Sequence, residues 1–343
     1  MVVPTDMADA VDLAFRSDAD PELRLTAFLY EQVFGHKATL MTFGAGGLTL
    51  FGRVEDRFAL TMPVKWGATV AAAARSDGMI EFRSGSQAGK EFVGPLDELD
   101  DPPPWAACPL AVVSAARTAG HPLGGMSLLV GTALPEGAGM QSEIALTAVV
   151  VSVLAELFGA ELTLAQRAPL GDLAAQLAAS SALDGTALLV DRREMTAEPV
   201  PFDLAGAGLR LMIIDLGTRV TSEPSEGAGD LAMEAVEVLE RGDIVGLGPL
   251  FGRATSLAGD EVVEAVVNAA RHAGALGAGT LPGGCLTALV PVDRLSPVRA
   301  AVTAAWPGAR APKFLTAVSS RGGRPVRSER GTAQIHRPII RRQ

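Results

Sequence analysis

The segment that most constrains this chain is residues 134–146, in which a glycine-bearing loop leads into a long apolar helix. It reads Leu-Pro-Glu-Gly-Ala-Gly-Met-Gln-Ser-Glu-Ile-Ala-Leu. Gly137 and Gly139 let the backbone approach an anion closely, and the helix predicted from the apolar run Ile144–Ala155 directs its unpaired N–H groups at the same point. The segment is therefore typical of a phosphate-binding loop. Glu143 departs from that pattern, because its carboxylate would repel a bound phosphate.

Length and composition indicate a globular protein with one large domain or two ordinary ones. Of the 343 residues, 48% are apolar, which is enough to build a core. The net charge of -10 argues against general nucleic-acid binding. The carboxy-terminal segment is basic instead, and we expect either a disordered tail or a segment that binds an acidic partner. Its charged residues are Arg321, Arg324, Arg327, Arg330, Arg337, Arg341 and Arg342 against Glu329.

Cysteine content and hydropathy indicate a reduced protein outside the membrane. The two cysteines, Cys108 and Cys285, fit a reduced compartment and cannot form a zinc site alone. The amino terminus lacks the charged-then-apolar pattern of a secretory signal. The longest apolar run, Ile144–Ala155, is too short to span a bilayer. The sequence therefore predicts a cytoplasmic protein with no membrane partner.

Apolar periodicity predicts an α+β fold, with helices and antiparallel strands mixed along the chain. Short apolar runs within residues 47–84 indicate a group of antiparallel strands. The polar segment Thr218–Asp230, rich in Gly, Ser and Pro, is predicted to be a flexible crossing between two halves. Further strands are expected at Met126–Val130, Ala187–Asp191, Leu209–Asp215, Leu286–Val292 and Phe314–Ser319. Helices are expected at Pro21–Gly35, from near Trp105, from near Ile144, and at Leu173–Ala182, Leu231–Arg241, Glu261–Ala273 and Val298–Ala305.

Several separated motifs, in the same order, resemble galactokinases of the GHMP kinase superfamily. The matching segments are Trp105-Ala106-Ala107, Ala119-Gly120-His121-Pro122, 134–146, Gln166-Arg167-Ala168, Gln176–Asp191, Leu239–Gly248, Ala273–Ala278 and Gly283–Val290. The resemblance implies two α+β lobes with the active site between them. Residues 1–200 would form a ribosomal-S5-like amino-terminal lobe and residues 201–320 a ferredoxin-like carboxy-terminal lobe. Residues 321–343 would follow as the basic, disordered tail.

The resemblance also implies ATP and Mg²⁺ as cofactors and indicates residues for them. Arg53 matches an arginine that stabilises the transferring phosphate in this family. Ser142, the hydroxyl that remains of the second signature motif, would ligate Mg²⁺ or a phosphate oxygen. Glu143 is either a further metal ligand or an acid that stabilises the first helical turn, and we favour the second interpretation. The residues implied for the nucleotide are Gly137, Ala138, Gly139, Ser142, Gly283 and Gly284.

At several functional positions the chain departs from the galactokinase pattern. Counting back from Asp191 without a gap places Ala175 at the position of the catalytic base, and an alanine accepts no proton. The first signature keeps Gly52-Arg53-Val54 and then lacks the stretch that supplies the sugar-binding residues. Pro282 removes a backbone donor from the third signature. The substrate-contacting tyrosine of the linker is missing, and the single tyrosine is Tyr30.

Two functions are compatible with these observations. The one we favour is a catalytically impaired galactokinase-like protein with a binding or regulatory role. The alternative is an active ATP-dependent galactokinase or a related sugar or small-molecule kinase, for which Asp172 would have to replace the base and Glu55 and Asp56 would have to bind the sugar. In both, a small-molecule ligand or a nucleotide is the expected partner. A third hypothesis gives the Arg-rich tail an acidic partner.

Overall fold

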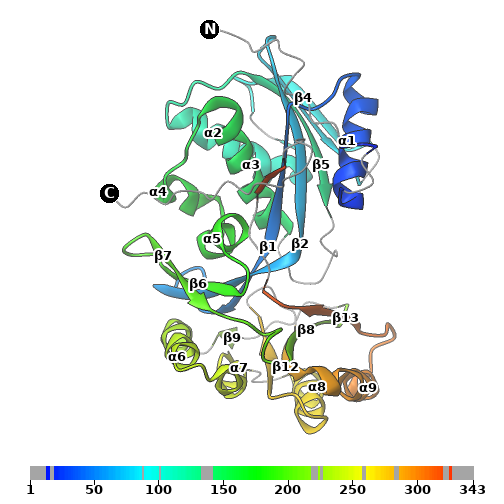
Figure 1. The fold of residues 1–343 in the computed structure, drawn as a ribbon, viewed down its shortest axis with the longest axis vertical. Coiled ribbons are helices and arrows are strands. Elements are labelled where there is room, and N and C mark those ends of the chain that lie inside the picture. The colour runs from blue at the N-terminus through cyan, green and yellow to red at the C-terminus, as the bar shows by residue number, and fades with distance from the viewer. Residues whose placement is uncertain are drawn as a thin grey trace.

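The structure is a computed structural model that describes residues 13–15, 19–86, 89–99, 102–132, 142–217, 223–224, 227–256, 260–281, 286–319 and 324–326. The chain folds into two lobes, each built around a β-sheet with helices packed on it (Figure 1). This arrangement confirms the predicted two-lobed α+β class.

The first lobe contains an eight-stranded mixed sheet in which β2 (Phe58–Arg75) is the central strand. β2 pairs antiparallel with β1 (Leu40–Phe51), with β5 (Gly125–Thr132) and with β6 (Thr186–Asp191). The amino-terminal end of β2 pairs with β6, and its carboxy-terminal half pairs with β5. The parallel pairing in this sheet is that of β3 with β5. The other strands are β3 (Met79–Ser84), β4 (Glu91–Pro95), β7 (Thr196–Pro201) and β14 (Arg324–Val326).

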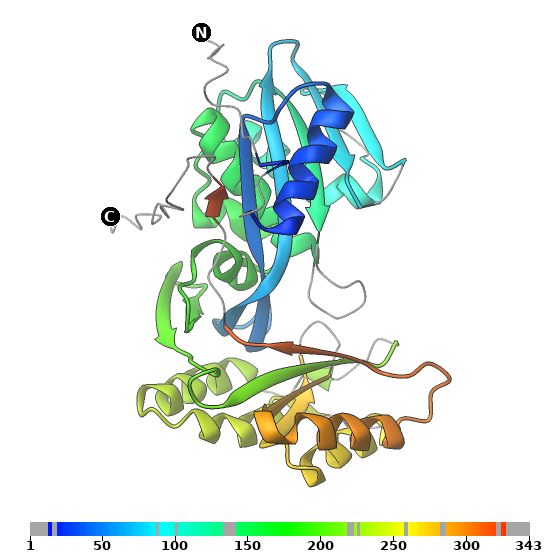
Figure 2. The same ribbon diagram turned by 45° about the vertical axis from the view of Figure 1, so that its right-hand side comes forward.

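Helices cover both faces of this sheet. α3 (Ser142–Phe158) and α5 (Leu173–Ser181) pack on β1 and β2 from one side, with α2 (Pro104–Thr118) against α3. α1 (Pro21–Phe34) packs on β5 and β2 from the other side, as Figure 2 shows. α1 begins where the Asp20 carboxylate accepts from the Glu22 N–H and ends at Gly35, whose φ of 73° is left-handed.

The second lobe contains a four-stranded antiparallel sheet in the order β11-β12-β8-β13. Its strands are β8 (Leu209–Asp215), β11 (Gly277–Thr280), β12 (Leu286–Pro291) and β13 (Lys313–Ala317). Its helices are α6 (Ala228–Glu240), α7 (Leu247–Arg253), α8 (Glu261–His272) and α9 (Leu295–Ala305). The short strands β9 (Glu223–Pro224) and β10 (Thr255–Ser256) pair with each other, and the short helix α4 (Leu164–Arg167) precedes α5 in the first lobe.

Strand β8 is buried on both faces, and this explains its unbroken apolar sequence. Leu211 and Ile213 belong to the main core cluster, whereas Met212 and Ile214 belong to a separate cluster with α8 and α9. The alternation follows from the two-residue period of a strand.

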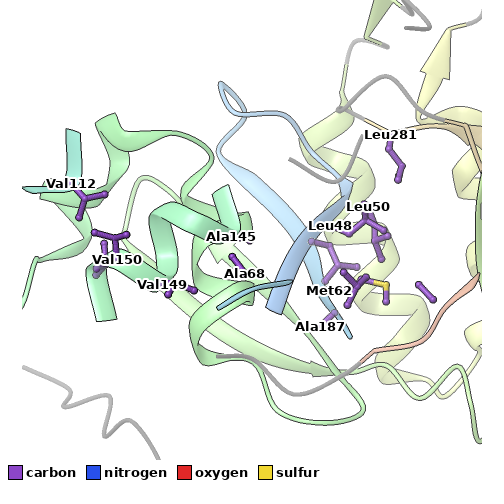
Figure 3. Packing of buried hydrophobic residues seen from close by; sticks show 14 of the residues in the cluster. Leu48, Leu50, Met62, Ala68, Val112, Ala145, Val149, Val150, Ala187 and Leu281 are labelled. Carbon is purple, nitrogen blue, oxygen red and sulfur yellow. The ribbon is translucent and has the colours of Figure 1, made fainter. Parts of the chain in front are cut away.

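The main core runs from one lobe into the other. It contains Leu48 and Leu50 of β1 together with Leu281, which follows β11 in the second sheet (Figure 3). The rings of Phe51 and Phe251, from β1 and α7, lie with their centroids 5.0 Å apart, and both residues are 1% exposed. The lobes therefore share apolar surface as well as a chain crossing.

The end of the chain returns to the first lobe. Arg324–Val326 form β14, which pairs antiparallel with Met41–Phe43 at the edge of the large sheet; the dark red arrow beside β1 in Figure 2 marks it. The prediction of a disordered tail over residues 321–343 is therefore wrong for these three residues, because the edge of β1 offers them backbone partners. Residues 320–323 and 327–343 lie outside the described part of the chain.

Most predicted elements are present with shifted ends, such as α6, which begins at Ala228 inside the predicted flexible crossing. The prediction for Thr218–Asp230 is wrong from Ala228 onward, since those residues are helical, and Glu223–Pro224 pair as a short strand. Strand β3 lies inside the strand group predicted over residues 47–84, whereas strands β4, β7 and β11 and helix α7 were not expected from the sequence. The lobe boundary at residues 200 and 201 stays a prediction.

Replacing Phe251 with alanine tests the shared core. We expect the free energy of unfolding, measured by urea titration, to fall by about 3–5 kcal/mol, because a cavity forms beside Phe51. Val245→Ala is the control: Val245 is 52% exposed, so the loss should stay within about 0.5 kcal/mol. Equal effects of the two substitutions would contradict a shared core.

Candidate functional site

The candidate site lies where the turn 52–57 between β1 and β2 meets the start of α5 and the end of β6. Antiparallel pairing of Phe58 with Asp191 places the turn beside β6. Gly52 opens the turn with a φ of 84°, which favours glycine. At Gly47, further back on β1, an added side-chain carbon would collide with the backbone of Ala175. The close approach of α5 to β1 thus brings position 175 to this region.

Position 175, where the resemblance places the catalytic base, is a buried alanine. Ala175 is 1% exposed and lies in the first turn of α5. Its side chain carries no proton acceptor, so any base at this place must come from another residue. The carboxylate nearest in sequence is Asp172, which is 4% exposed.

The Asp172 carboxylate is engaged in structural hydrogen bonds at both oxygens. Its Oδ1 accepts from the backbone N–H of Ala174 at 3.0 Å, more weakly from that of Ala175 at 3.5 Å, and from Arg192 Nη2 at 3.0 Å. Its Oδ2 accepts from Thr49 Oγ1 at 2.8 Å. Asp172 is therefore the N-cap of α5 and the partner of the partly buried Arg192. This arrangement does not favour Asp172 as a replacement base.

Arg53, the predicted phosphate-stabilising residue, pairs within its own turn. Its Nη1 lies 2.9 Å from Glu55 Oε1 and its Nε 3.4 Å from Asp56 Oδ2, while its backbone N–H donates to the same Asp56 oxygen at 2.8 Å. The predicted sugar acceptors Glu55 and Asp56 are thus both partners of Arg53. The catalytic role of Arg53 stays a prediction.

Two further arginines fasten the turn to its surroundings. Arg192 Nη1 donates to the Asp56 carbonyl at 2.9 Å while its Nη2 holds Asp172. Arg57 binds Asp191 through Nη2 at 2.7 Å and Nε at 3.1 Å. The hydrogen bonds from Arg57 are the main cause of the lowered pKa of Asp191. Together these pairs hold the turn, α5 and β6 in one ionic network.

The second lobe covers this turn from outside. Gly229 in the first turn of α6 lies against the side chain of Asp56 and the carbonyl of Phe58. Helix α6 also packs on β1 and β2. The turn that follows Gly52-Arg53-Val54 is therefore packed against α6 of the second lobe.

Glu143 stands in the first turn of α3 and interacts with Cys108 of α2. Burial, then the charge of Glu143, and then its hydrogen bond with the thiol raise the pKa of Cys108. Glu143 lies in the first turn of α3, where an acid is favourable, but its role as a helix-terminal acid or as a metal ligand stays a prediction. Within the described ranges, no group of three or more His, Cys, Asp or Glu side chains could hold a metal ion.

The residues implied for the nucleotide are not placed by the structure. Gly137, Ala138, Gly139, Gly283 and Gly284 lie outside the described residues, as does Cys285. Ser142 begins α3, but its side chain is also outside them. ATP and Mg²⁺ binding at these positions stays a prediction.

Sequence reasoning missed three members of the network, namely Thr49, Arg57 and Arg192. Arg57 and Asp191 are 134 positions apart and meet through the pairing of β2 with β6. The available signal was the placement of charged residues at the ends of two apolar strands. It indicates an ionic cluster only once the strand register is known.

Known proteins similar to this chain include galactokinases. No family model matches the chain. The galactokinase of Streptomyces coelicolor is 29% identical over 216 residues, which are 58% of this chain and 55% of that protein, so the match spans about half of the relative's length. The galactokinase of Mycobacterium tuberculosis is 26% identical over 344 residues, covering 78% of this chain and 94% of that protein. The solved structure of Lactococcus lactis galactokinase complexed with galactose has a TM-score of 0.76 at 19% identity, covering 88% of this chain and 99% of that one.

Replacing Asp172 with alanine tests this ion pair, in which the Arg192 side chain is 14% exposed. Loss of the carboxylate leaves the partly buried charge of Arg192 without its partner and removes the N-cap of α5, so we expect the free energy of unfolding to fall by about 2–4 kcal/mol. The double variant Asp172→Ala with Arg192→Met should recover part of this loss, since no charge is left unpaired. Asp97→Ala, at an exposed pair with Arg117, is the control and should cost at most about 1 kcal/mol. A loss no larger than the control's would show that the pair does not hold the site.

The Arg57–Asp191 pair should make stability depend on pH. Because the folded-state pKa of Asp191 lies below its ordinary value of 3.8, the pair stabilises the protein above that pH, and the contribution is lost as pH falls through the folded-state value. We expect the melting temperature of Asp191→Asn to lie below that of the wild type near neutral pH. The gap should narrow below about pH 4. A gap that is independent of pH would contradict this assignment.

Proposed function

We propose that this chain, a galactokinase-like member of the GHMP kinase superfamily, is catalytically impaired and acts by binding a small molecule or a nucleotide rather than by phosphorylating a sugar. The observation that carries the proposal is Ala175 at the position of the catalytic base, with the neighbouring Asp172 bound to Arg192 and Thr49. The binding role is inferred from a fold that keeps the two lobes while its site chemistry departs from the family.

The loss of the base lowers the expected rate without excluding transfer. A general base typically contributes about 10²–10⁴-fold to a rate. Phosphoryl transfer rests mainly on positioning and on stabilisation of charge. The positioning groups therefore decide whether any activity remains.

The positioning groups in the shortened first signature support the proposal. Arg53 would have to leave Glu55 and Asp56 to reach a phosphate, and both carboxylates would have to leave Arg53 to accept sugar hydroxyls. A sugar needs several such acceptors, because each hydroxyl buried without a partner costs free energy. The contact of Gly229 with Asp56 closes the turn further.

An active ATP-dependent galactokinase, or a related sugar or small-molecule kinase, is the second candidate. It is favoured by the fold shared with a galactokinase that was solved with galactose. In that case ATP and Mg²⁺ would be the cofactors, held by the loop around Gly137 and Gly139 and by Ser142, and Arg53 would stabilise the transferring phosphate.

The proposal also includes the lobe boundaries, the compartment and the partner of the Arg-rich tail. Residues 1–200 and 201–320 are proposed as the two lobes, and the protein is proposed to be cytoplasmic with no membrane partner. In the part of the chain that the structure describes, no helix is long and apolar enough to cross a membrane. The arginines after residue 326 are proposed to bind an acidic partner, and no general nucleic-acid binding is proposed.

Single-turnover phosphorylation of galactose and a panel of related sugars, with excess protein, ATP and Mg²⁺, tests the proposal. We expect no phosphorylated sugar above the protein-free background. Melting temperatures with nucleotides or sugars alone test binding, since a ligand at 100 times its Kd adds about 2.7 kcal/mol of stability. Sustained, Mg²⁺-dependent turnover by the wild type would overturn the impairment, and the absence of any stabilising ligand would overturn the binding role.

Ala175→Asp and Ala175→Asn separate the effect of a base from the effect of side-chain size. We expect both variants to stay inactive, because the sugar-binding stretch is missing as well. The two side chains have nearly the same volume, so any difference in rate between them reports on proton transfer. Urea unfolding of both confirms that they are compared in the folded state.

A further inference from the structure

Strand β2 contains a bulge of two residues, Lys65 and Trp66, at which its pairing with β1 is interrupted. The register shifts between Ala45 and Gly46 of β1, so that no residue of β1 stands opposite Lys65 or Trp66. A bulge disrupts the ladder locally and redirects side chains, and bulges are frequent next to functional sites. The Lys65 side chain is exposed, and the half-buried Trp66 packs against the main core.

The other edge of β2 is also open at this point. β6 pairs with β2 over residues 58–61 and β5 over residues 68–75, and within the described residues no strand pairs with the segment between them on this edge. Pro63 lies in that segment, and a proline is compatible with a strand where no ladder N–H is required. The sheet therefore has a gap between β5 and β6, and Lys65 and Trp66 lie at this gap.

Two hydrogen-bond donors at the gap have no acceptor among the described residues. The Lys65 ammonium lies 5.1 Å from the centre of the Trp66 ring, and no carboxylate of the described residues pairs with it. The Trp66 indole N–H donates to no group of the described chain either. By contrast, Trp306 Nε1 donates to the Arg310 carbonyl at 3.0 Å.

Lys65 differs in this respect from the arginines of the adjoining segments. Arg53, Arg57 and Arg75 each pair with a carboxylate, at 2.9, 2.7 and 2.6 Å. The cation–π contact holds the Lys65 ammonium beside the indole of Trp66. An exposed cation next to a free N–H donor is complementary to an anion that accepts hydrogen bonds.

The gap lies near the starts of the two segments that the sequence predicts to bind phosphate. Thr132, which ends β5 and precedes the glycine-bearing loop, pairs with Ala68, three residues along β2 from Lys65 or roughly 10 Å. Leu281, which precedes the third-signature segment, shares the main core with Met62 of β2 (Figure 3). Both segments lie outside the described residues, so the site proposed below consists of the two bulge residues alone.

We propose that Lys65 and Trp66 bind the phosphate group of a small-molecule ligand. Lys65 supplies the positive charge, and the Trp66 indole N–H donates to one of the phosphate oxygens. A phosphate group fits both donors, because it carries negative charge and three strong acceptor oxygens. The inference rests on the proposed binding role and names the ligand class for that role, since nucleotides and sugar phosphates both carry this group.

Titration calorimetry with the full-length chain tests the ligand class. The phosphate-bearing ligands are ADP, galactose 1-phosphate and inorganic phosphate, and adenosine and galactose are their counterparts without phosphate. We expect ADP or galactose 1-phosphate to bind at least about tenfold more tightly than its counterpart, because the counterpart leaves Lys65 without an anion. The tightest of the three identifies the source as a nucleotide, a sugar phosphate or the free ion.

The outcomes separate this proposal from the binding role itself. If adenosine or galactose binds as tightly as the phosphate-bearing ligands, the binding role stands and the phosphate site is overturned. If none of the five ligands binds at millimolar concentration, both are overturned.

Matched variants assign the phosphate group to residues. Lys65→Met keeps an unbranched side chain without the charge, and it should weaken binding of the phosphate-bearing ligand about tenfold or more while leaving its counterpart unchanged. Lys65→Arg should retain most of the affinity. Trp66→Phe keeps a ring and loses the N–H, so it should weaken binding about two- to tenfold.

Lys313→Met, which removes an exposed lysine at the start of β13, is the control and should bind as the wild type does. Urea unfolding of each variant shows that folded proteins are compared. An affinity of Lys65→Met for ADP and galactose 1-phosphate equal to that of the wild type would place the phosphate elsewhere and overturn the proposal.

Discussion

The pairing of strand β2 with three neighbours is the constraint on which the rest of the structure depends. Along its 18 residues, β2 pairs with β1, and it pairs with β5 through Ala68–Arg75 and with β6 through Phe58–Thr61. A strand shared in this way fixes the register of its partners, since a shift by one residue would turn every side chain to the other face. The start of α5, the shortened turn and the end of β6 meet because β2 places them there.

The same geometry shows how the region around the turn 52–57 is held together by contacts within the protein. Asp172 caps α5 and pairs with the partly buried Arg192, and Arg57 pairs with Asp191. Function resides in particular side chains on a scaffold that can be retained without them. Arg192, which pairs with the Asp172 carboxylate and donates to the Asp56 carbonyl, supports packing of the turn on α5.

The sequence predicted the elements whose pattern is local and missed those that depend on context. Strand β8 was found because its apolar run is continuous, and α8 because its apolar residues follow a helical period. Strand β11, Gly277–Thr280, consists mainly of small residues and carries no such pattern. At the candidate site, the assignment of position 175 to the base rests on counting along a motif and stays a prediction. The pairing of Arg192 with Asp172 depends on the approach of α5 to β6. That approach depends on tertiary packing, which local sequence propensities do not predict.

Strand β14 has a consequence for how the chain protects itself from association. Without it, Met41–Phe43 of β1 would stand at the open edge of the large sheet with their backbone groups unpaired. Such an edge is a template for pairing with another chain, and natural proteins cover it. Strand β14 thus covers an edge that could otherwise pair with another chain. A chain that ends before Arg324 would aggregate more readily while its hydrophobic core stayed folded.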